Sequence, residues 1–502
     1  MYSRVVCIAI DIINADKPPA SLAFLAGACE QAKVEYRCIS LNNVLLNAMS
    51  QSDFDKIYNE LKLQVNNELE PTLLEIFNNS IKEIAEFNPN CIAVSLFSFI
   101  QMPIAEIYLK LLKQHLPTVD IIAGGPGVGA SVNNTKSNGK LLLEKKYIDY
   151  YCLGEGDEVL VDFLQGKKDL LGLNHCGLAY ESWVPQLADL EGSYLLPSYK
   201  KIQTKNYKNL ELKDKPVYSI STSRGCVRAC TFCDVAKMWP KFRFRDGKSV
   251  AQEVLKHHQD VGACNFHIVD SLINGSLKSF RDFNIEMIKL KKDYSTLADF
   301  SYNGMFIIRD KKSHTEELFA LMQQAGCESL AIGIETGSDR LRIDDINKKF
   351  TNADLDHHLE MCQKYKIRNA FLMFVGFPTE TDEDFDQTLH MLDRYQKYLI
   401  DDTILGINHM GIYALLPDTP VYDNMEAMGI AYDYDYEHLD NVSVAQLNWH
   451  NKNNPDLTIK KRIERDLRLR KRAAELRYPV PYSQRYMGYI KYMDGIVLPM
   501  PD

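Results

Sequence analysis

The first 165 residues alternate short apolar segments with segments of helical periodicity. This alternation predicts an α/β domain in which a parallel sheet carries helices on both faces. Such a sheet binds its ligands in the loops at the carboxyl ends of its strands. The expected strands are Arg4–Ile10, Val34–Ser40, Cys91–Phe97, Asp120–Gly124 and Ile148–Leu153, and the expected helices are Ser21–Lys33, Pro71–Phe87, Pro103–Gln114 and Asp157–Gln165.

At residue 216 the alternation resumes with a longer period. Six strand–helix units of this size predict a partial or complete TIM-type barrel, with its chemistry at the carboxyl ends of the strands. The expected strands are Val217–Thr222, Asn265–Val269, Asp299–Gly304, Ser329–Ile334, Asn369–Val375 and Gly406–Tyr413. The expected regions are a Rossmann-like domain over 1–165, a connector over 166–215 with a small hairpin around 177–187, the barrel over 216–430 and a mainly helical cap over 431–502.

Charge and cysteine content restrict the class of protein. Asp and Glu total 67 against 58 for Lys and Arg, and this net charge of −9 argues against a protein that coats nucleic acid or an anionic membrane. Twelve cysteines in a long chain without a secretory signal or membrane span indicate a reducing, cytoplasmic setting. One local exception is the segment 460–477, with nine basic and three acidic residues. Its apolar stripe predicts a docked helix, and contact with RNA or an anionic substrate is the alternative.

Nine cysteines are dispersed and are expected to be small buried side chains. The other three lie together in Ser223-Arg-Gly-Cys226-Val-Arg-Ala-Cys230-Thr-Phe-Cys233, directly after the first expected barrel strand. Thiolates are soft ligands that select zinc or iron–sulfur clusters. Three ligands on a four-iron cluster leave one iron open to a substrate, whereas zinc needs a fourth ligand. A zinc site completed by a distant residue and a chance spacing of buried cysteines are the alternatives.

This cysteine segment resembles the signature of the radical S-adenosylmethionine (radical SAM) superfamily. The resemblance implies that Cys226, Cys230 and Cys233 hold a [4Fe-4S] cluster and that S-adenosylmethionine chelates the open iron. One electron then cleaves the sulfonium and yields a 5′-deoxyadenosyl radical, which abstracts hydrogen from a substrate. Phe232, the aromatic residue before the last cysteine, is expected to pack on the cofactor.

Further segments of the expected barrel resemble the same family. Gly333-Ile-Glu335-Thr-Gly337-Ser338 is similar to its Gly-Ile-Glu-Ser-Gly-Ser motif, and Gly376-Phe-Pro-Thr-Glu380-Thr is similar to its Gly-Leu-Pro-Gly-Glu-Thr turn, with Thr379 in place of glycine. The resemblance implies that Glu335 and Ser338 contact the cofactor. It implies the same for Asp270, which follows the second expected strand. Weaker candidates are Arg243 and Arg245 after the cysteine segment, and Asn303 and Arg309 for the substrate cavity.

The first expected domain resembles a cobalamin-binding domain of the kind fused ahead of the barrel in cobalamin-dependent radical SAM enzymes. The resemblance rests on Gly124-Gly125-Pro126, Gly154-Glu155-Gly156 and Val94-Ser95. It implies that Ser95, Gly124, Gly125, Gly154, Glu155 and Gly156 line the cofactor, although no Asp-x-His-x-x-Gly motif supplies an axial histidine. A dinucleotide fingerprint at 125–130 with Asp149 is rejected, because it follows the fourth strand and not the first.

The sequence thus predicts a cobalamin-dependent radical SAM enzyme, with methyl transfer to an unactivated carbon through methylcobalamin as the first choice. The alternatives are a non-methylating cyclase or rearrangement enzyme and a cobalamin or iron–sulfur sensor without turnover. A methylthiotransferase is disfavoured, because the first domain lacks a second cysteine triad. The expected partners are a small-molecule or peptide substrate and an electron donor such as flavodoxin or ferredoxin, with no membrane and no nucleic acid.

Overall fold

The computed structural model describes residues 1–10, 17–50, 52–54, 71–98, 101–129, 137–176, 190–207, 215–432 and 447–480. The chain divides into two compact units. The first comprises 1–220 together with 253–265, and the second comprises 221–252 together with 266–502. The expected hairpin around 177–187 lies outside the described residues.

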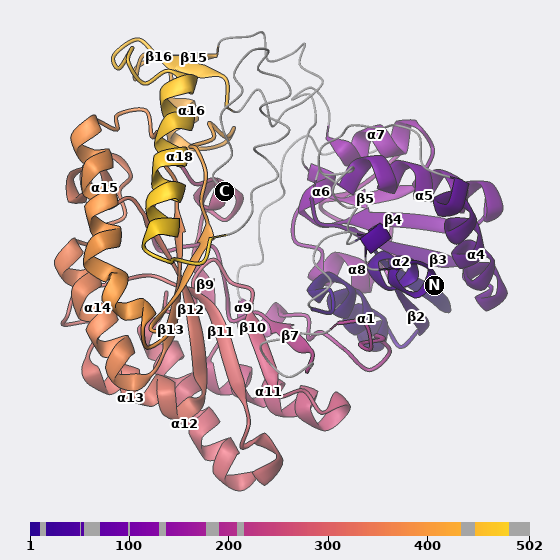
Figure 1. Ribbon diagram of the computed structural model, residues 1–502. Coiled ribbons are helices and arrows are strands. Elements are labelled where there is room, and N and C mark those ends of the chain that lie inside the picture. Colours follow the sequence, from indigo (N-terminus) through magenta and orange to yellow (C-terminus); the bar gives the residue numbers. More distant parts are fainter. Residues whose placement is uncertain are drawn as a thin grey trace. The chain divides into compact units, whose positions relative to one another are not determined.

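The first unit is built on a six-stranded sheet in the order β2-β1-β3-β4-β5-β6 (Figure 1). Strand β1 pairs in parallel with both β2 and β3, so the strand order reverses at the β1–β3 boundary, which is where doubly wound sheets bind ligands. Six of the seven residues of β1 are buried, as expected for a parallel strand covered on both faces. The strands are β1 (Arg4–Ile10), β2 (Glu35–Ser40), β3 (Cys91–Leu96), β4 (Asp120–Gly124), β5 (Tyr150–Cys152) and β6 (Leu173–His175).

The helices of this unit follow the sheet strands in alternation. They bury a continuous apolar core with the strands, in which Phe77 of α4 packs edge-on against Tyr108 of α5. The helices are α1 (Ala20–Ala32), α2 (Leu41–Ala48), α4 (Pro71–Phe87), α5 (Met102–His115), α6 (Pro126–Gly129), α7 (Asn138–Glu144), α8 (Asp157–Leu164) and α9 (Leu190–Ser193).

The region expected as a connector is more structured than its sequence suggests. Strand β6 pairs antiparallel with β5, and α9 follows it. Residues 166–215 fall in the first compact unit. Leu173 and Asn174 are buried, so a segment without a readable period still contributes an edge strand.

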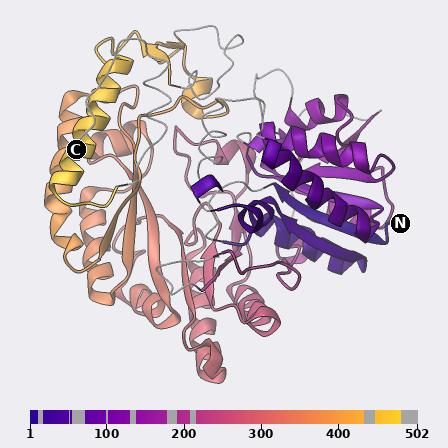
Figure 2. The same ribbon diagram turned by 45° about the vertical axis from the view of Figure 1, so that its right-hand side comes forward.

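The second sheet is six-stranded in the order β14-β13-β12-β11-β10-β7, and the pairs from β11 to β14 are parallel. Helices α12 to α15 line its outer side, as in a partial barrel (Figures 1 and 2). The predicted α/β fold class is therefore confirmed. The strands are β7 (Val217–Ile220), β10 (Asn265–Ile268), β11 (Ser301–Phe306), β12 (Cys327–Glu335), β13 (Arg368–Met373) and β14 (Ile404–His409), with the short pair β8 (Ser223–Arg224) and β9 (Arg243–Phe244) beside the cysteine segment.

Local sequence signals start the outer helices. Thr351 and Thr381 each form a capping box with an aspartate three residues later, which satisfies the first free amides of α14 and α15. The helices are α10 (Val235–Met238), α11 (Gly247–Val261), α12 (Leu277–Asp293), α13 (Glu316–Ala325), α14 (Asn352–Tyr365) and α15 (Asp382–Tyr395), and a π-helical turn spans Leu341–Asp345.

The last described elements continue the second unit. They are α16 (Pro420–Asp423), the antiparallel pair β15 (Ile430–Tyr432) and β16 (Trp449–Asn451), and α18 (Ile459–Glu475). Trp449 is fully buried in a cluster with Phe377 and Tyr413. Among the helices that the structure describes, none has the length and apolar character that a membrane span requires.

Candidate functional site

The three cysteines lie in the loop between β8 and α10. All three thiols are partly exposed and free of disulfides. The chain enters the loop at Gly225, whose φ of +85° favours glycine and whose Cβ would lie 3.0 Å from the Lys241 carbonyl oxygen. Among the described residues, no three His, Cys, Asp or Glu side chains converge on one metal ion.

The middle of the cysteine loop is held by the chain that follows the π-helical turn. Thr231 donates from its amide to the Ile346 carbonyl at 3.1 Å and from its hydroxyl to the Asp345 carbonyl at 2.7 Å. The Asn347 amide side chain donates to the Ala229 carbonyl at 2.8 Å. The position of Cys230 is thus fixed by bonds to both sides of it.

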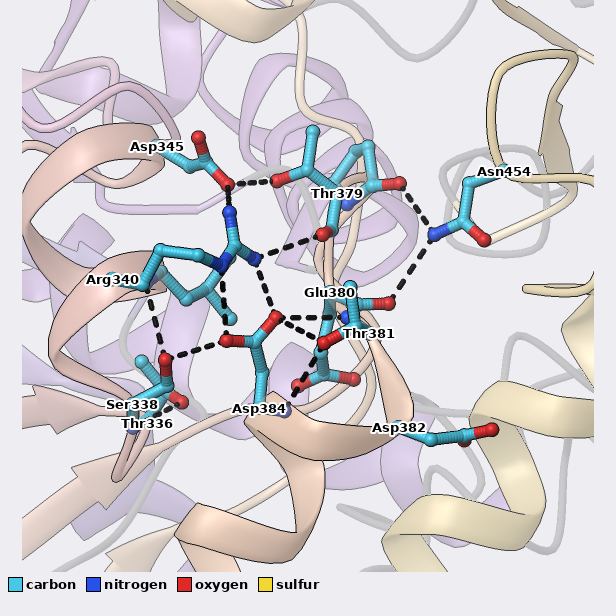
Figure 3. A network of polar contacts seen from close by, with 12 residues as sticks. Thr336, Ser338, Arg340, Asp345, Thr379, Glu380, Thr381, Asp382, Asp384 and Asn454 are labelled. Atoms are coloured by element: carbon cyan, nitrogen blue, oxygen red, sulfur yellow. Dashed lines mark hydrogen bonds and ion pairs between the residues drawn. The ribbon is translucent and has the colours of Figure 1, made fainter.

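Arg340 fixes the segment 345–347, which holds the cysteine loop (Figure 3). Arg340 donates from Nη1 to the Asp345 carboxylate at 2.8 Å and from Nε to Asp384 at 3.1 Å, and its Nη2 also bonds Asp384. Thr379 donates its hydroxyl to the same oxygen of Asp345, and its carbonyl accepts from Arg340 at 3.1 Å. The loops after β12 and β13 are therefore joined through one guanidinium.

Asp270 is buried and its carboxylate is fully engaged by the residues that precede the cysteine loop. It accepts from the Ser221 hydroxyl at 3.0 Å, the Ser223 hydroxyl at 2.8 Å, and both the amide and the hydroxyl of Thr222. Burial raises its pKa to about 6 in spite of these bonds. In this arrangement Asp270 positions the start of the cysteine loop instead of presenting a free carboxylate.

Glu335 ends β12 in the left-handed region, with φ of +64°. Its carboxylate lies 2.7 Å from the ammonium group of Lys348, and both side chains are largely buried. Burial opposes the charge of Lys348, but Glu335 and Cys230 outweigh it and raise the lysine pKa. Gly333 makes room for this pair, because a Cβ there would lie 2.3 Å from Lys348 Nζ. Strained backbone of this kind clusters at functional sites.

Phe232 and Ser338 occupy different surroundings. The Phe232 ring contacts Phe374 edge-on with centroids 5.2 Å apart, and Lys348 Nζ lies 5.7 Å from its centre. Ser338 is buried and donates to the Asp384 carboxylate at 2.6 Å. Its hydroxyl oxygen also accepts from the Leu341 amide at 3.2 Å, so Ser338 belongs to the network beneath the site.

Protonation of the thiols reflects their partial enclosure. Burial raises the pKa of Cys230, against the nearby Lys348 charge, and raises the pKa of Cys233 to about 11. Enclosed thiols of this kind ionise when a cation takes the place of the proton.

In the first unit, the predicted residues gather at the carboxyl ends of β3, β4 and β5. Ser95 is paired with Ala9 of β1 and with Gly124 of β4, which places it at the point where the strand order reverses. Gly125 (φ +97°) and Gly154 (φ +124°) turn the chain away from the sheet. A Cβ at Gly125 would lie 2.5 Å from the Leu96 carbonyl oxygen.

The other two glycines of this edge have few neighbours among the described residues. A Cβ at Gly124 or Gly156 would meet only Cys152 among the described residues, at 3.9 and 3.8 Å. Glu155 lies between Gly154 and Gly156, just before α8. We call Gly124, Gly125, Gly154 and Gly156 the glycine shelf. Residues 11–16, 99–100 and 130–136 of the neighbouring loops lie outside the described residues.

Several weaker sequence candidates have structural partners. Arg245 is buried and donates to the Ser221 carbonyl at 2.9 Å, and Arg243 belongs to β9 beside the Trp239 ring. Asn303 bonds His267. Asp149 forms an ion pair with Lys113 at 2.6 Å and accepts from the Ile121 amide, in keeping with the rejected dinucleotide site.

The basic helix α18 is docked along α15. Its cations pair with carboxylates: Lys461 with Asp382, Arg465 with Glu380 and Asp382, Arg468 with Asp386, Arg470 with Asp466, and Arg472 with Asp393. The docked-helix prediction is therefore the one that the structure supports.

Sequence reasoning missed two residues that organise the site. Lys348 and Arg340 lie in a segment without a recognisable motif, and their partners are separated from them by 5 to 44 residues. The available signal was weak: two arginines and two adjacent lysines shortly after an apolar strand.

The comparisons with known proteins agree with this geometry. Residues 220–392 match the family model described as the radical SAM superfamily. The chain is 24% identical over 365 residues to an anaerobic magnesium-protoporphyrin IX monomethyl ester cyclase of Cereibacter sphaeroides, across 70% of this chain and 56% of that protein. It is 24% identical over 325 residues to an uncharacterized methyltransferase of Pyrococcus horikoshii, across 62% of this chain and 66% of that protein. Each match thus spans less than two thirds of the relative's length.

A solved structure shares the two-part fold. The radical S-adenosylmethionine methyltransferase TsrM of Kitasatospora setae, with cobalamin and a [4Fe-4S] cluster bound, matches with a TM-score of 0.59. The match covers 87% of this chain and 81% of that chain at 15% identity. The segment 220–392, which contains the cysteine loop and much of the second sheet, is therefore the part of the chain that resembles the radical SAM superfamily.

Proposed function

We propose that the chain is a cobalamin-dependent radical SAM enzyme that transfers a methyl group to an unactivated carbon. The observation that carries this proposal is the loop of three free thiols beside the second sheet, inside the segment that matches the family model. The fold relation to a cobalamin-bound methyltransferase and the relation to a methyltransferase of Pyrococcus horikoshii support the finer assignment.

The cysteine loop fits a [4Fe-4S] cluster. Cys226, Cys230 and Cys233 would hold three irons, and S-adenosylmethionine would bind the fourth. When bound, this pair would supply a radical able to abstract hydrogen. The chain's own contribution is positional: Asp270 holds the start of the loop, and the main chain at 345–347 holds its middle.

The glycine shelf fits a flat macrocycle. Ser95 and the four shelf glycines lie at the carboxyl edge of a sheet with flavodoxin-type strand order, where large planar cofactors bind. A side chain at Gly124 or Gly156 would project into the space in front of the edge. Cobalamin bound there would supply a methyl carrier. Ser95 would offer a hydroxyl and the glycines their main-chain amides.

The test is anaerobic reconstitution of the full chain with iron, sulfide, hydroxocobalamin, S-adenosylmethionine and dithionite. We expect both S-adenosylhomocysteine and 5′-deoxyadenosine, because methyl loading and radical formation each consume one S-adenosylmethionine. A Cys230→Ala variant should lose iron and 5′-deoxyadenosine. Full iron content and product in that variant would contradict the cluster assignment, and a wild-type protein that forms neither product would favour a sensor.

A second candidate is a cyclase or rearrangement enzyme. The relation to the cyclase of Cereibacter sphaeroides favours it, because that match extends over 70% of this chain. Formation of 5′-deoxyadenosine without S-adenosylhomocysteine, in protein that retains a corrin absorption band after desalting, would select this candidate over the methyltransferase.

A further inference from the structure

Two arginines next to the cysteine loop form no ion pair with a carboxylate of the described residues. Arg228 lies inside the loop, and its Nη2 donates to the Ile308 carbonyl at 3.1 Å. Arg309 follows β11, and its Nη2 donates to the carbonyls of Asn274 and Gly275, both at 3.1 Å. Within the described residues, neither guanidinium forms an ion pair, and the buried Nε of Arg309 has no hydrogen-bond partner. We call Arg228 and Arg309 the arginine pair.

Arg228 of the arginine pair lies beside the first cysteine, because its amide donates to Cys226 Sγ at 3.3 Å. Burial lowers the pKa of Arg309 and the charge of Arg228 lowers it further, whereas Asp310 and then Cys226 act in the opposite direction. The Nη2 atoms of both guanidiniums donate to main-chain carbonyls, which hold the two cations in place beside the loop.

The carboxylates around the loop contact other groups. Glu335 lies 2.7 Å from Lys348. Asp310 acts on Arg309, but its side chain is exposed and accepts from the Ser313 amide at 2.9 Å. Asp270 accepts from the hydroxyl groups of Ser221, Thr222 and Ser223. Neither arginine therefore has a salt-bridge partner among these carboxylates.

We infer that the arginine pair sets the reduction potential of the cluster held by Cys226, Cys230 and Cys233. This inference rests on the proposed function. Three thiolates and a [4Fe-4S]²⁺ core carry a net charge of −1, and one electron from an external donor brings it to −2 with no proton or bond change. Charge near a cluster and its hydrogen bonds tune its potential. Two fixed cations at Cys226 favour the reduced state and so ease the electron transfer that starts the reaction.

The test is a redox titration of the SAM-free, anaerobically reconstituted full chain, followed by the electron paramagnetic resonance signal of the reduced cluster. In Arg309→Gln we expect the equilibrium constant for reduction to fall about tenfold, which is about 59 mV for one electron. Arg309→Lys keeps the charge and should retain the wild-type potential. Arg281→Gln is the matched control, because Arg281 of α12 is already paired with Glu317 at 3.2 Å and should leave the potential unchanged.

Each outcome decides the inference. An unchanged potential in Arg309→Gln with full iron content overturns it and leaves the proposed function intact. If the reduction potential shifts equally in Arg309→Lys and Arg309→Gln, the inference is also overturned. The cause would then be the loss of the guanidinium hydrogen bonds to the Asn274 and Gly275 carbonyls and not the loss of the charge. If Arg309→Gln weakens binding of S-adenosylmethionine but keeps the potential, the arginine pair is a carboxylate site instead. If Arg309→Gln does not load iron, Arg228→Gln with the same expectation replaces it. Failure of the wild type to load a cluster would overturn the proposed function as well.

Discussion

Asp384 shows how much one residue contributes to the described site. It caps α15, accepts from Ser338 at 2.6 Å and binds Arg340 through both oxygens. Burial opposes its ionisation, but the bonds from Arg340, Ser338 and Thr381 outweigh it and lower the pKa from 3.8 to about 2. A lowered carboxyl pKa stabilises the folded protein above pH 3.8, and this stabilisation disappears as the pH falls through about 2.

Replacement of this carboxylate should therefore have a pH-dependent effect. In Asp384→Asn we expect the free energy of unfolding to fall by about 2 kcal/mol at pH 6, at about 1.4 kcal/mol per pKa unit. Near pH 2 the contribution of the ionised carboxylate to this free energy should be almost absent in both proteins. Urea unfolding between pH 2 and 6 measures it. Asp386→Asn on the same helix is the control, because its carboxylate is exposed and lies 3.4 Å from Arg468. A loss for Asp384→Asn that is constant over this pH range would contradict the ion-pair explanation.

At the scale of elements, α18 is attached to the barrel by one buried ion pair and several exposed ones. Arg465 donates to Glu380 at 2.7 Å, and both side chains are buried. Glu380 in turn accepts from the Gly376 amide at 2.7 Å, so it connects α18 to the turn after β13. Burial raises the pKa of Glu380 to about 7 even with Arg465 beside it.

Removal of the buried partner should cost far more than removal of an exposed one. We expect Arg465→Met to lower the free energy of unfolding at pH 8 by about 3–5 kcal/mol, because it leaves Glu380 buried without a cation. Arg468→Met, which removes an exposed pair with Asp386, should cost less than about 1 kcal/mol. Urea denaturation compares the two variants. Equal losses would mean that α18 is held by its apolar face and not by the Glu380 contact.

The elements were easier to predict from the sequence than the site. Strands β1 and β4 and helix α4 have the predicted bounds, because burial on both faces and helical periodicity are local signals. The last barrel strand was predicted at Gly406–Tyr413 but spans Ile404–His409. Its apolar stretch continues through Tyr413, while the pairing is reduced to a single bridge between Val375 and Ile412.

The site depended on partners that lie far apart in the sequence. Asp270 was expected beside the cofactor, but its hydrogen bonds reach back 47 to 49 residues to the start of the cysteine loop. Ser338 was expected to bind the cofactor, but its hydroxyl donates to Asp384, 46 residues later. No local pattern reveals such bonds, so the cofactor contacts of Asp270, Glu335 and Ser338 remain predictions.

At the scale of the whole molecule, the two candidate cofactor sites belong to different compact units. The glycine shelf lies in the first unit and the three cysteines lie in the second. We therefore expect the sites to load independently. Cys226→Ala/Cys230→Ala/Cys233→Ala protein should lose its iron but retain the corrin band after addition of hydroxocobalamin and desalting.

The reverse variant completes the test. Gly124→Val places a branched side chain in front of the sheet edge, so it should lose the corrin band and retain iron. Gly411→Ala is the control, because a Cβ there meets no described atom within 4 Å. Absorption spectra and iron analysis of the same samples distinguish the cases. Loss of both cofactors in either variant would show that the sites are coupled.

The anchoring of the cysteine loop has a consequence for how such proteins diverge. Thr231 bonds the main-chain carbonyls of Asp345 and Ile346, which every amino acid carries. Substitution of Asp345 or Ile346 therefore leaves these carbonyl acceptors in place, whereas an insertion or deletion in this segment shifts them. Point mutations can accumulate over long evolutionary times under this arrangement, but changes in segment length are penalised.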